Sequence, residues 1–145
     1  MVKRIMTFVL IYFCFNAFGN NKLLLNSIEK RTAEYSKIAK NIWEYAEVGY
    51  KEEKSSKELI NLLEKNGFKI NKGVAGIPTA FVAEYNRGGS VIGILGEYDA
   101  LPGLSQTTST KKTKREGTNS GHACGHNLFG VALSLIHISE PTRPC

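Results

Sequence analysis

The sequence predicts an α/β fold in which two amphipathic helices are followed by a mixed sheet. Residues 24–47 and 51–66 carry apolar side chains at helical spacing. After Gly67 the chain changes to short runs of β-forming residues, and the most apolar run, 91–95, leads directly into a segment with two carboxylates. Ligands commonly bind where the strands of an α/β sheet end. We therefore expect a functional site at the end of this last strand.

The first predicted helix is long and presents one apolar stripe, formed by Leu24, Ile28, Tyr35, Ile38, Ile42 and Tyr45. Gly49 is expected to close it, because glycine readily takes the left-handed conformation that ends many helices. The second helix carries Glu52 and Glu53 in its first turn, where acidic side chains complement the helix dipole. It is expected to end at Asn66, directly before Gly67.

Three strands are expected in the following stretch, over residues 68–70, 79–85 and 91–95. The connection between the first two runs contains glycine and proline, and residues 86–90 have the composition of a tight turn. The third run is apolar almost without interruption, which is typical of a strand that is covered on both faces. These three strands complete the predicted sheet.

The overall composition is that of a folded domain, since 42% of the 145 residues are apolar. Lysine and arginine number 19 against 13 acidic residues, which gives a net charge of +6. Four of the basic residues form one short run that is typical of a solvated loop, Lys111, Lys112, Lys114 and Arg115. Aromatic residues do not alternate with this run, so no nucleic-acid partner is expected. Three cysteines are too few for a disulfide framework, although Cys124 and Cys145 could pair in an oxidising compartment.

The N-terminus has the organisation of an export signal. Two basic residues precede the apolar run 5–18, and small residues at positions 17 and 19 fit a signal-peptidase site before Asn20. We expect residues 1–19 to be a signal peptide and the protein to be exported, either to the periplasm or out of the cell. Without cleavage the run would anchor the chain in a membrane, although it is shorter than the ~20 residues of a full span.

The C-terminal residues 134–145 resemble the peptide that a sequencing-library adapter encodes when it is read in frame. Pro141 and Pro144 would stop any helix that enters this stretch. We therefore expect the domain to cover residues 20–133, and we assign no role to His137.

A cluster with metal-binding character follows the predicted sheet. His122, Cys124 and His126 lie two residues apart, and Gly125 adds no Cβ to hinder the approach of the last two to one cation. Thiolate and imidazole ligands both suit zinc. Two or three such ligands do not complete a site, so carboxylates would have to contribute.

Glu97 and Asp99 are the carboxylates that the predicted strand brings to this cluster. Either could ligate a metal through oxygen. Asp99 is better explained as the partner of a ligating imidazole, because metal-bound histidines usually donate their other ring N–H to a carboxylate or carbonyl. A hydrolytic site also needs a carboxylate that takes the proton from the attacking water.

Two other interpretations remain open at this point. Cys124 could be a nucleophile that His122 or His126 activates near a helix N-terminus, where the dipole lowers the pKa of a thiol. No oxyanion motif and no third, orienting residue accompany it. The cluster could also be a glycine-rich turn whose side chains pack without any ligand.

Five ordered blocks of the sequence resemble a known enzyme family; they lie at residues 42–47, 54–56, 73–81, 96–105 and 121–127. The last two read Gly-Glu-Tyr-Asp-Ala-Leu-Pro-Gly-Leu-Ser and Gly-His-Ala-Cys-Gly-His-Asn. Together the blocks are similar to the aminoacylase and carboxypeptidase family of di-metal amidohydrolases. Within it, they most resemble the branch that acts on aminobenzoyl-glutamate and indole-acetyl amino acids. The resemblance extends over residues 28–131.

The resemblance implies the N-terminal part of a zinc-peptidase-like catalytic domain. Cys124 and His126 match ligands of a zinc or manganese pair, and Asp99 matches the acidic residue that steadies the site. Glu97 stands where some members place a ligating histidine, and His122 matches a motif position without an assigned role. The implied reaction is hydrolysis of the amide bond in N-acyl or aminobenzoyl amino acids or in dipeptides.

The same family needs residues that this sequence does not contain. Its Glu-Glu pair, which includes the general base, and its remaining glutamate and histidine ligands come from a later part of a longer chain. A lid-like dimerisation domain also belongs to that later part. We therefore expect a truncated, inactive fragment of an enzyme that is a homodimer or hetero-oligomer at full length. The alternative is a non-catalytic chain with at most weak metal binding.

Overall fold

The computed structural model describes residues 2–86 and 88–139, with side chains from residue 22 onward. The helices in this part of the chain are α1 (Val2–Tyr45), α2 (Glu53–Lys65) and α3 (His126–Ser139). The strands are short and form antiparallel pairs, β1 (Lys69–Lys72) with β2 (Phe81–Glu84) and β3 (Leu101–Pro102) with β4 (Ser120–Gly121). A 3-10 turn, η1 (Val74–Gly76), connects β1 to β2. The mixed α/β class expected from the sequence is confirmed.

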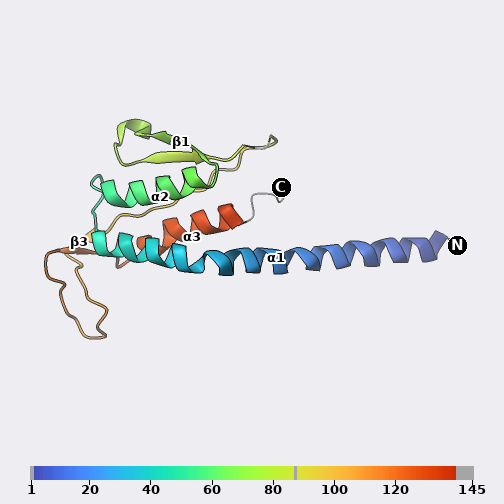
Figure 1. Cartoon of the computed structure of the whole chain (residues 1–145), viewed down its shortest axis with the longest axis horizontal. Coiled ribbons are helices and arrows are strands. Elements are labelled where there is room, and N and C mark those ends of the chain that lie inside the picture. Colours follow the sequence, from blue (N-terminus) through green and yellow to red (C-terminus); the bar gives the residue numbers. More distant parts are fainter. Residues whose placement is uncertain (1, 87, 140–145) are drawn as a thin grey trace.

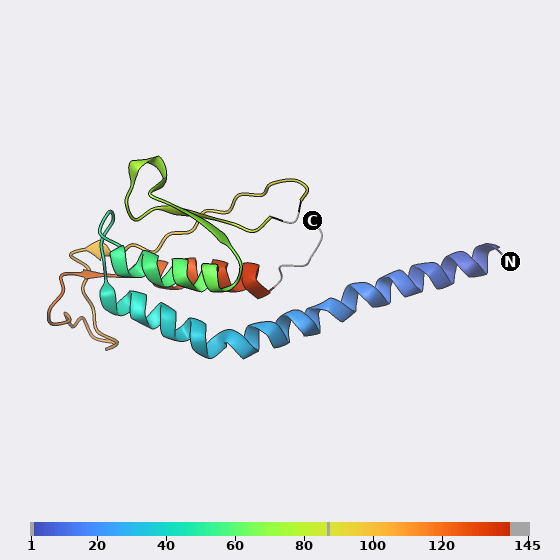
Figure 2. The same cartoon turned by 45° about the horizontal axis from the view of Figure 1, so that its top comes forward.

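The helices form the body of the molecule, and the two strand pairs lie at its edges (Figure 1). Both α2 and α3 pack on the C-terminal half of α1, and the β1–β2 hairpin covers the side of α2 that faces away from α1 (Figure 2). The loop between β3 and β4 extends away from the helices in both views. This arrangement brings the start of α3 close to the end of α1 and to the β3–β4 pair.

The core lies where the three helices meet. It contains the apolar face of each helix, with Tyr35, Ile38, Ala39 and Ile42 from α1, Leu59, Leu62 and Leu63 from α2, and Val131 and Ile138 from α3. The helical spacing in residues 24–47 and 51–66 therefore predicted the buried faces of α1 and α2 correctly. Ile42 is completely buried, and Leu59 is 2% exposed.

The turn between α1 and α2 differs from the predicted one. Its left-handed residues are Ala46 and Tyr50, with φ of 46° and 67°, and Gly49 is not among them. The amide of Ala46 donates to the carbonyl of Ile42 (3.1 Å), which closes the last turn of α1. The expectation for Gly49 was wrong because tertiary contacts can hold other residues in this conformation, although each such residue costs about 1 to 2 kcal/mol.

Two glutamates in this turn hold the start of α2. The Glu47 carboxylate accepts hydrogen bonds from the amides of Lys54 (3.0 Å) and Ser55 (2.8 Å), and so satisfies free N–H groups of the first turn. Glu52 precedes α2 instead of lying in its first turn. Its carboxylate is buried and accepts a hydrogen bond from Thr79 Oγ1 (2.7 Å). Glu52 therefore links the turn to the start of the β2 region, a role that its position in the sequence did not predict.

The third predicted strand does not form. Residues 91–95 belong to no strand pair, and Val91 and Leu95 are 98% and 80% exposed. The first two predicted strands do form, as β1 and β2, and they pair with each other. An uninterrupted apolar run becomes buried only when neighbouring strands and covering helices enclose it. Residues 2–86 and 88–139 supply no strand beside it.

α1 extends far into the predicted signal peptide. It begins at Val2 and runs through the predicted cleavage position before Asn20. In the part of the chain that the structure describes, no helix is long and apolar enough to cross a membrane.

α3 extends into the C-terminal stretch 134–145. The helix continues to Ser139, and Ile138 packs in the core. His137 is exposed on its last turn. The helix-stopping prolines and Cys145, which could pair with Cys124 in an oxidising compartment, lie outside the described residues.

Tyr35 places a hydroxyl group in the core, where it has no hydrogen-bond partner among the described residues. Burial raises the pKa of Tyr35 from 10.0 to about 12; Arg31 opposes this shift and Glu34 adds to it. Replacing Tyr35 with phenylalanine removes an unpaired buried polar group. We expect the free energy of unfolding to rise by about 1 kcal/mol at neutral pH.

The same substitution should change the response to alkali. Because the tyrosine ionises near pH 10 in the unfolded chain and near pH 12 in the folded one, stability is complete below pH 10 and is lost as the pH rises toward 12. The loss attributable to Tyr35 is about 2 to 3 kcal/mol. Burial raises the pKa of Tyr98 to about 12 as well, and this group contributes to the loss in every variant. Urea unfolding across this range should therefore show a smaller loss in Tyr35→Phe than in the wild type and in Tyr50→Phe, whose ring is exposed. Parallel pH curves for all three proteins would contradict the expectation.

Candidate metal centre

One imidazole lies between two carboxylates at the start of α3. His126 Nδ1 is 2.8 Å from Asp99 Oδ1, and His126 Nε2 is 3.1 Å from Glu97 Oε2. The His126 side chain is 18% exposed, whereas that of Glu97 is 52% exposed. The structure thus brings together three predicted site residues from two distant parts of the sequence.

Main-chain contacts fix the position of Asp99. The next amide, that of Ala100, donates to the carbonyl of Glu47 (2.7 Å), and Val48 pairs with Ala100 in a parallel bridge. The segment that carries Asp99 is therefore attached to the turn that follows α1. Immediately afterwards β3 pairs with β4, so the chain returns from the long loop to the segment that carries Asp99. The histidine cluster directly follows β4.

Two glycines allow the chain to approach this point. A Cβ on Gly130 of α3 would lie 3.2 Å from the carbonyl oxygen of Glu97 and 3.3 Å from Leu59 Cδ1, so glycine lets α3 pack closely on the carboxylate segment. Gly125 has a φ of 76°, which favours glycine, and its amide donates to the carbonyl of His122 (3.2 Å). The resulting turn directs the chain into α3 at His126.

Cys124 lies apart from this group. It is an exposed free cysteine two residues before α3. Across residues 2–86 and 88–139, no three His, Cys, Asp or Glu side chains are grouped so that they could hold a metal ion. In the same part of the chain neither His122 nor His126 forms a hydrogen bond to the thiol, so the geometry does not support the nucleophile interpretation.

His122 takes a position different from that expected of a ligand. Its Nε2 is 3.0 Å from the carbonyl oxygen of Ile42 near the end of α1, and its Nδ1 is buried with no partner in the described part of the chain. Because a carbonyl can only accept, Nε2 carries the proton. Burial lowers the pKa of His122; the Ile42 carbonyl opposes this, His126 adds to the lowering, and Asp99 opposes it.

The residues around His126 fit one half of a metal site. Zinc binds imidazole nitrogen and carboxylate oxygen at about 2.0 to 2.2 Å, so two such ligands of a tetrahedral ion lie roughly 3.4 Å apart. His126 Nε2 and Glu97 Oε2 lie 3.1 Å apart, so a small widening would accommodate an ion between them. Asp99 contacts the other ring nitrogen, where a carboxylate fixes the tautomer and orientation of a ligating histidine. Other residues would have to supply the remaining ligands. Cys124 lies two residues before His126 in the chain.

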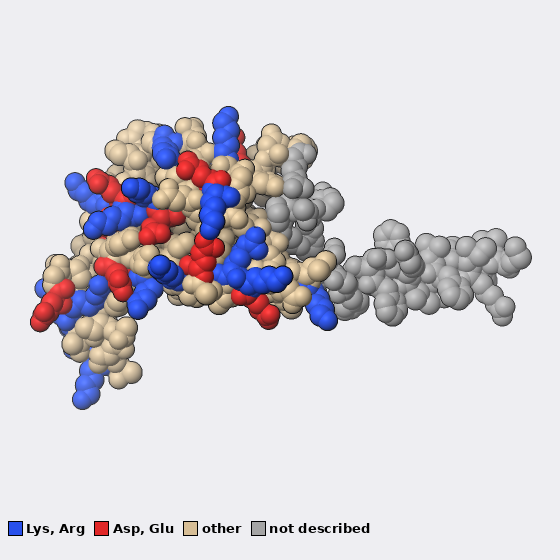
Figure 3. All heavy atoms as spheres, viewed as in Figure 1, with Lys and Arg blue, Asp and Glu red and all other residues tan. Residues whose placement is uncertain are grey.

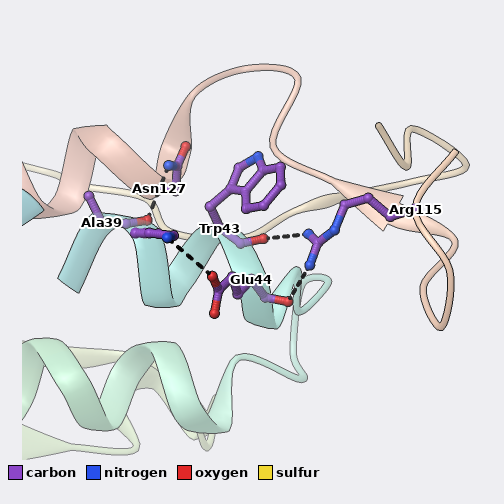
Figure 4. Close-up of polar contacts among 6 residues, drawn as sticks. Ala39, Trp43, Glu44, Arg115 and Asn127 are labelled. Atoms are coloured by element: carbon purple, nitrogen blue, oxygen red, sulfur yellow. Dashed lines mark hydrogen bonds and ion pairs between the residues drawn. The ribbon is translucent and has the colours of Figure 1, made fainter. Parts of the chain in front are cut away.

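The sequence did not reveal the arginine that holds the base of the long loop. Arg115 was expected to be solvated, but its guanidinium donates to the carbonyls of Trp43 (2.9 Å) and Glu44 (3.2 Å) and lies 4.1 Å from the centroid of the Trp43 ring (Figure 4). These carbonyls belong to the last turn of α1, where they lack helical partners. A cation near a helix C-terminus is a favourable pairing, but nothing in the sequence connects this loop to that helix end.

A shallow cavity of about 570 Å³ lies in the same loop, lined by residues 114–119. Neither the carboxylates nor the imidazole of the candidate centre line it, so it is distinct from that centre. On the face shown in Figure 3, basic and acidic side chains are interspersed over the described body.

Comparison with known proteins places these observations in a family context. No family model matches the chain. It is 42% identical over 115 residues to one of the subunits of the p-aminobenzoyl-glutamate hydrolase of Escherichia coli, an alignment that covers 79% of this chain and 24% of that protein. It is 37% identical over 106 residues to thermostable carboxypeptidase 1 of Saccharolobus solfataricus, covering 68% and 26%. It is 30% identical over 124 residues to Xaa-Arg dipeptidase of Homo sapiens, covering 74% and 25%.

The chain spans about a quarter of the length of these relatives. Their names are those of a hydrolase of an aminobenzoyl amino acid, a carboxypeptidase and a dipeptidase, as the five sequence blocks implied. The resemblance is therefore confirmed, and the chain belongs to the aminoacylase and carboxypeptidase family of amidohydrolases.

Proposed function

We propose that this chain forms part of a metal-dependent amidohydrolase that cleaves the amide bond of an N-acyl or aminobenzoyl amino acid, or of a dipeptide. The observation that carries the proposal is the His126 imidazole held between Asp99 and Glu97. The names of the relatives support the reaction class, since they include hydrolysis of p-aminobenzoyl-glutamate and of dipeptides.

In this proposal His126 and Glu97 hold one ion of a zinc or manganese pair through Nε2 and Oε2. Cys124, two residues before His126, would be a further ligand. Asp99 is a supporting residue that accepts a hydrogen bond from the Nδ1–H group of His126 and so keeps Nε2 directed at the ion. A divalent metal bound here would supply a Lewis acid that polarises the amide carbonyl of the substrate.

Zinc titration of the purified chain, followed by calorimetry, tests the centre. We expect saturable uptake by the wild type and a loss of about 100-fold or more in affinity in His126→Ala and Cys124→Ala, because each substitution removes a ligand. His137→Ala is the matched control, since this histidine is exposed on the last turn of α3. Equal zinc affinity in His126→Ala and His137→Ala would contradict the proposed centre. A parallel titration with manganese compares the two metals.

We further propose that the 145-residue chain has no hydrolytic activity by itself. Both carboxylates of the candidate centre are engaged with His126, so neither is free to act as the general base. Assays with an N-acyl amino acid and with p-aminobenzoyl-glutamate, in the presence of zinc or manganese, should show no turnover above buffer. Turnover that a chelator abolishes would overturn this expectation.

A second candidate function is that of a non-catalytic chain with at most weak metal binding. It is favoured by the lack of a three-ligand group within residues 2–86 and 88–139 and by the exposed apolar segment 91–95. The zinc titration separates the two candidates, because the non-catalytic chain would show only weak uptake that His126→Ala leaves unchanged.

Export and assembly are also part of the proposal. We propose that residues 1–19 direct export and that the full-length protein forms a homodimer or a hetero-oligomer; the latter is supported by the name of the Escherichia coli relative, which describes it as one subunit of its hydrolase. No nucleic-acid partner is proposed. N-terminal sequencing of protein recovered outside the cytoplasm should begin at Asn20, and an intact N-terminus would contradict cleavage.

A further inference from the structure

Two side chains attach the segment that carries the proposed ligands to helix α1. His122 Nε2 donates to the carbonyl of Ile42 (3.0 Å), and Asn127 Nδ2 donates to the carbonyl of Ala39 (3.2 Å). Ile42 and Ala39 are three residues apart in α1 and so lie on one face of it. Figure 4 shows Asn127, at the start of α3, directed at the Ala39 carbonyl. The segment is thus anchored at two points on one helix face.

The chain between the two anchors is a compact turn. The amide of Gly125 donates to the carbonyl of His122 (3.2 Å), and the amide of Leu128 donates to the carbonyl of Gly125 (2.9 Å). Two of the three proposed ligands, Cys124 and His126, lie within this turn. Its position on α1 therefore determines where the His126 ring lies.

The carboxylate partner of that ring is held to the same end of α1. Asp99 is followed by Ala100, whose amide donates to the carbonyl of Glu47, two residues beyond the end of the helix. The imidazole and its carboxylate thus belong to two separate segments; one is fixed to the last turns of α1 and the other to the turn that follows α1. Their 2.8 Å contact depends on both attachments.

Burial makes the two anchors energetically significant. Asn127 is 9% exposed, and His122 Nδ1 is buried. A buried amide or imidazole that loses its acceptor is left without water to replace it, and this destabilises the anchored arrangement. Both anchors bond to main-chain carbonyls of α1, and neither forms a hydrogen bond to the Glu97, Asp99 or His126 side chains in the described part of the chain.

We propose that His122 and Asn127 are positioning residues, which hold His126 against Asp99 by anchoring the intervening turn to the carbonyls of Ile42 and Ala39. His122 thereby has a role other than metal ligation. The functional meaning of the anchors rests on the metal centre proposed above, but the anchoring itself is testable in the metal-free protein.

The metal-free test observes the Nδ1 proton of His126 by NMR. Hydrogen-bonded to Asp99 in a mostly buried site, this proton should give a slowly exchanging downfield signal, assigned by its loss in His126→Ala. We expect the signal to broaden or disappear in His122→Leu and in Asn127→Leu, which keep bulk and remove the donor. His122→Gln should restore it, because a glutamine amide can donate to the same carbonyl.

A matched control separates positioning from general stability. Asn66 Nδ2 donates to the carbonyl of Leu62 (2.8 Å) in α2, a bond of the same kind as that of Asn127 but away from the centre. Asn66→Leu should lower the urea midpoint, by less than Asn127→Leu because the Asn66 bond is only partly buried, and it should leave the His126 signal intact. A His126 signal that persists in both His122→Leu and Asn127→Leu would overturn the proposal.

Zinc affinity, measured on the same variants, links the anchors to the centre. We expect a fall of about 10- to 100-fold in His122→Leu and Asn127→Leu, recovery in His122→Gln and no change in Asn66→Leu. If the wild type takes up no zinc while the NMR signal responds as expected, the metal centre fails and the anchoring stands. If the wild type binds zinc and neither leucine variant changes the signal, the anchoring fails and the centre stands.

Discussion

Replacing Gly121 with alanine is expected to disrupt the β3–β4 pair and to lower the free energy of unfolding by about 3 kcal/mol. A Cβ at this position would overlap the carbonyl oxygen of Leu104, and it would lie 3.1 Å from the carbonyl carbon and 3.4 Å from Ser105 Cα. All three are main-chain atoms, so no side-chain rotation can relieve the overlap. Because Gly121 directly precedes the His122 anchor, we also expect zinc uptake to be lost.

Gly93→Ala is the matched control for this substitution. A Cβ on Gly93 meets nothing within 4 Å, and its backbone does not adopt a positive φ. Its free energy of unfolding should change by less than about 0.5 kcal/mol. Urea unfolding monitored by circular dichroism measures both variants. Similar, small changes at the two glycines would show that β4 does not approach residues 104–105 as closely as described.

Truncation of Ile42 to alanine should destabilise the protein by about 4 kcal/mol. Its side chain is completely buried in the core between the helices, and alanine would leave a cavity there. By contrast, Leu95→Ala should change stability by less than about 0.5 kcal/mol, because Leu95 is 80% exposed.

This pair of variants also tests where the segment 91–95 lies. The sequence predicts that Leu95 belongs to a buried strand, whereas the structure leaves it exposed. Chemical denaturation of the two variants under identical conditions distinguishes these positions. A loss of stability in Leu95→Ala comparable to that in Ile42→Ala would support the buried strand.

The sequence was sufficient to predict α1 and α2, and it indicated that Asp99 and the histidine cluster belong to one site. Helical periodicity is a local property, and the spacing in α1 and α2 identified the side chains that form the core. A metal-bound histidine typically needs a carboxylate behind it, and on this ground the sequence predicted that Asp99 supports an imidazole; the structure places Asp99 2.8 Å from His126, and the supporting role stays a prediction. For the helices, the spacing of apolar residue types carried the information; for Asp99, the residue type itself did.

Features that depend on distant partners could not be predicted in the same way. The run 91–95 has the composition of a strand, but composition does not show whether a neighbouring strand is present. Arg115 and Asn127 bind main-chain carbonyls of α1. Every residue offers such a carbonyl, so the sequence contains no sign of which one is used. His122 was recognised as part of the cluster, but its partner could be found only in the structure.

Glu47 joins two parts of the molecule at a single residue. Its carboxylate holds the first turn of α2, while its main-chain carbonyl holds Ala100 beside Asp99. A transient opening of the corner between the two helices would release both contacts together. The helix start and the carboxylate segment should therefore belong to one cooperative unit of local unfolding, and the lifetime of the Asp99 geometry is set by how often that corner opens.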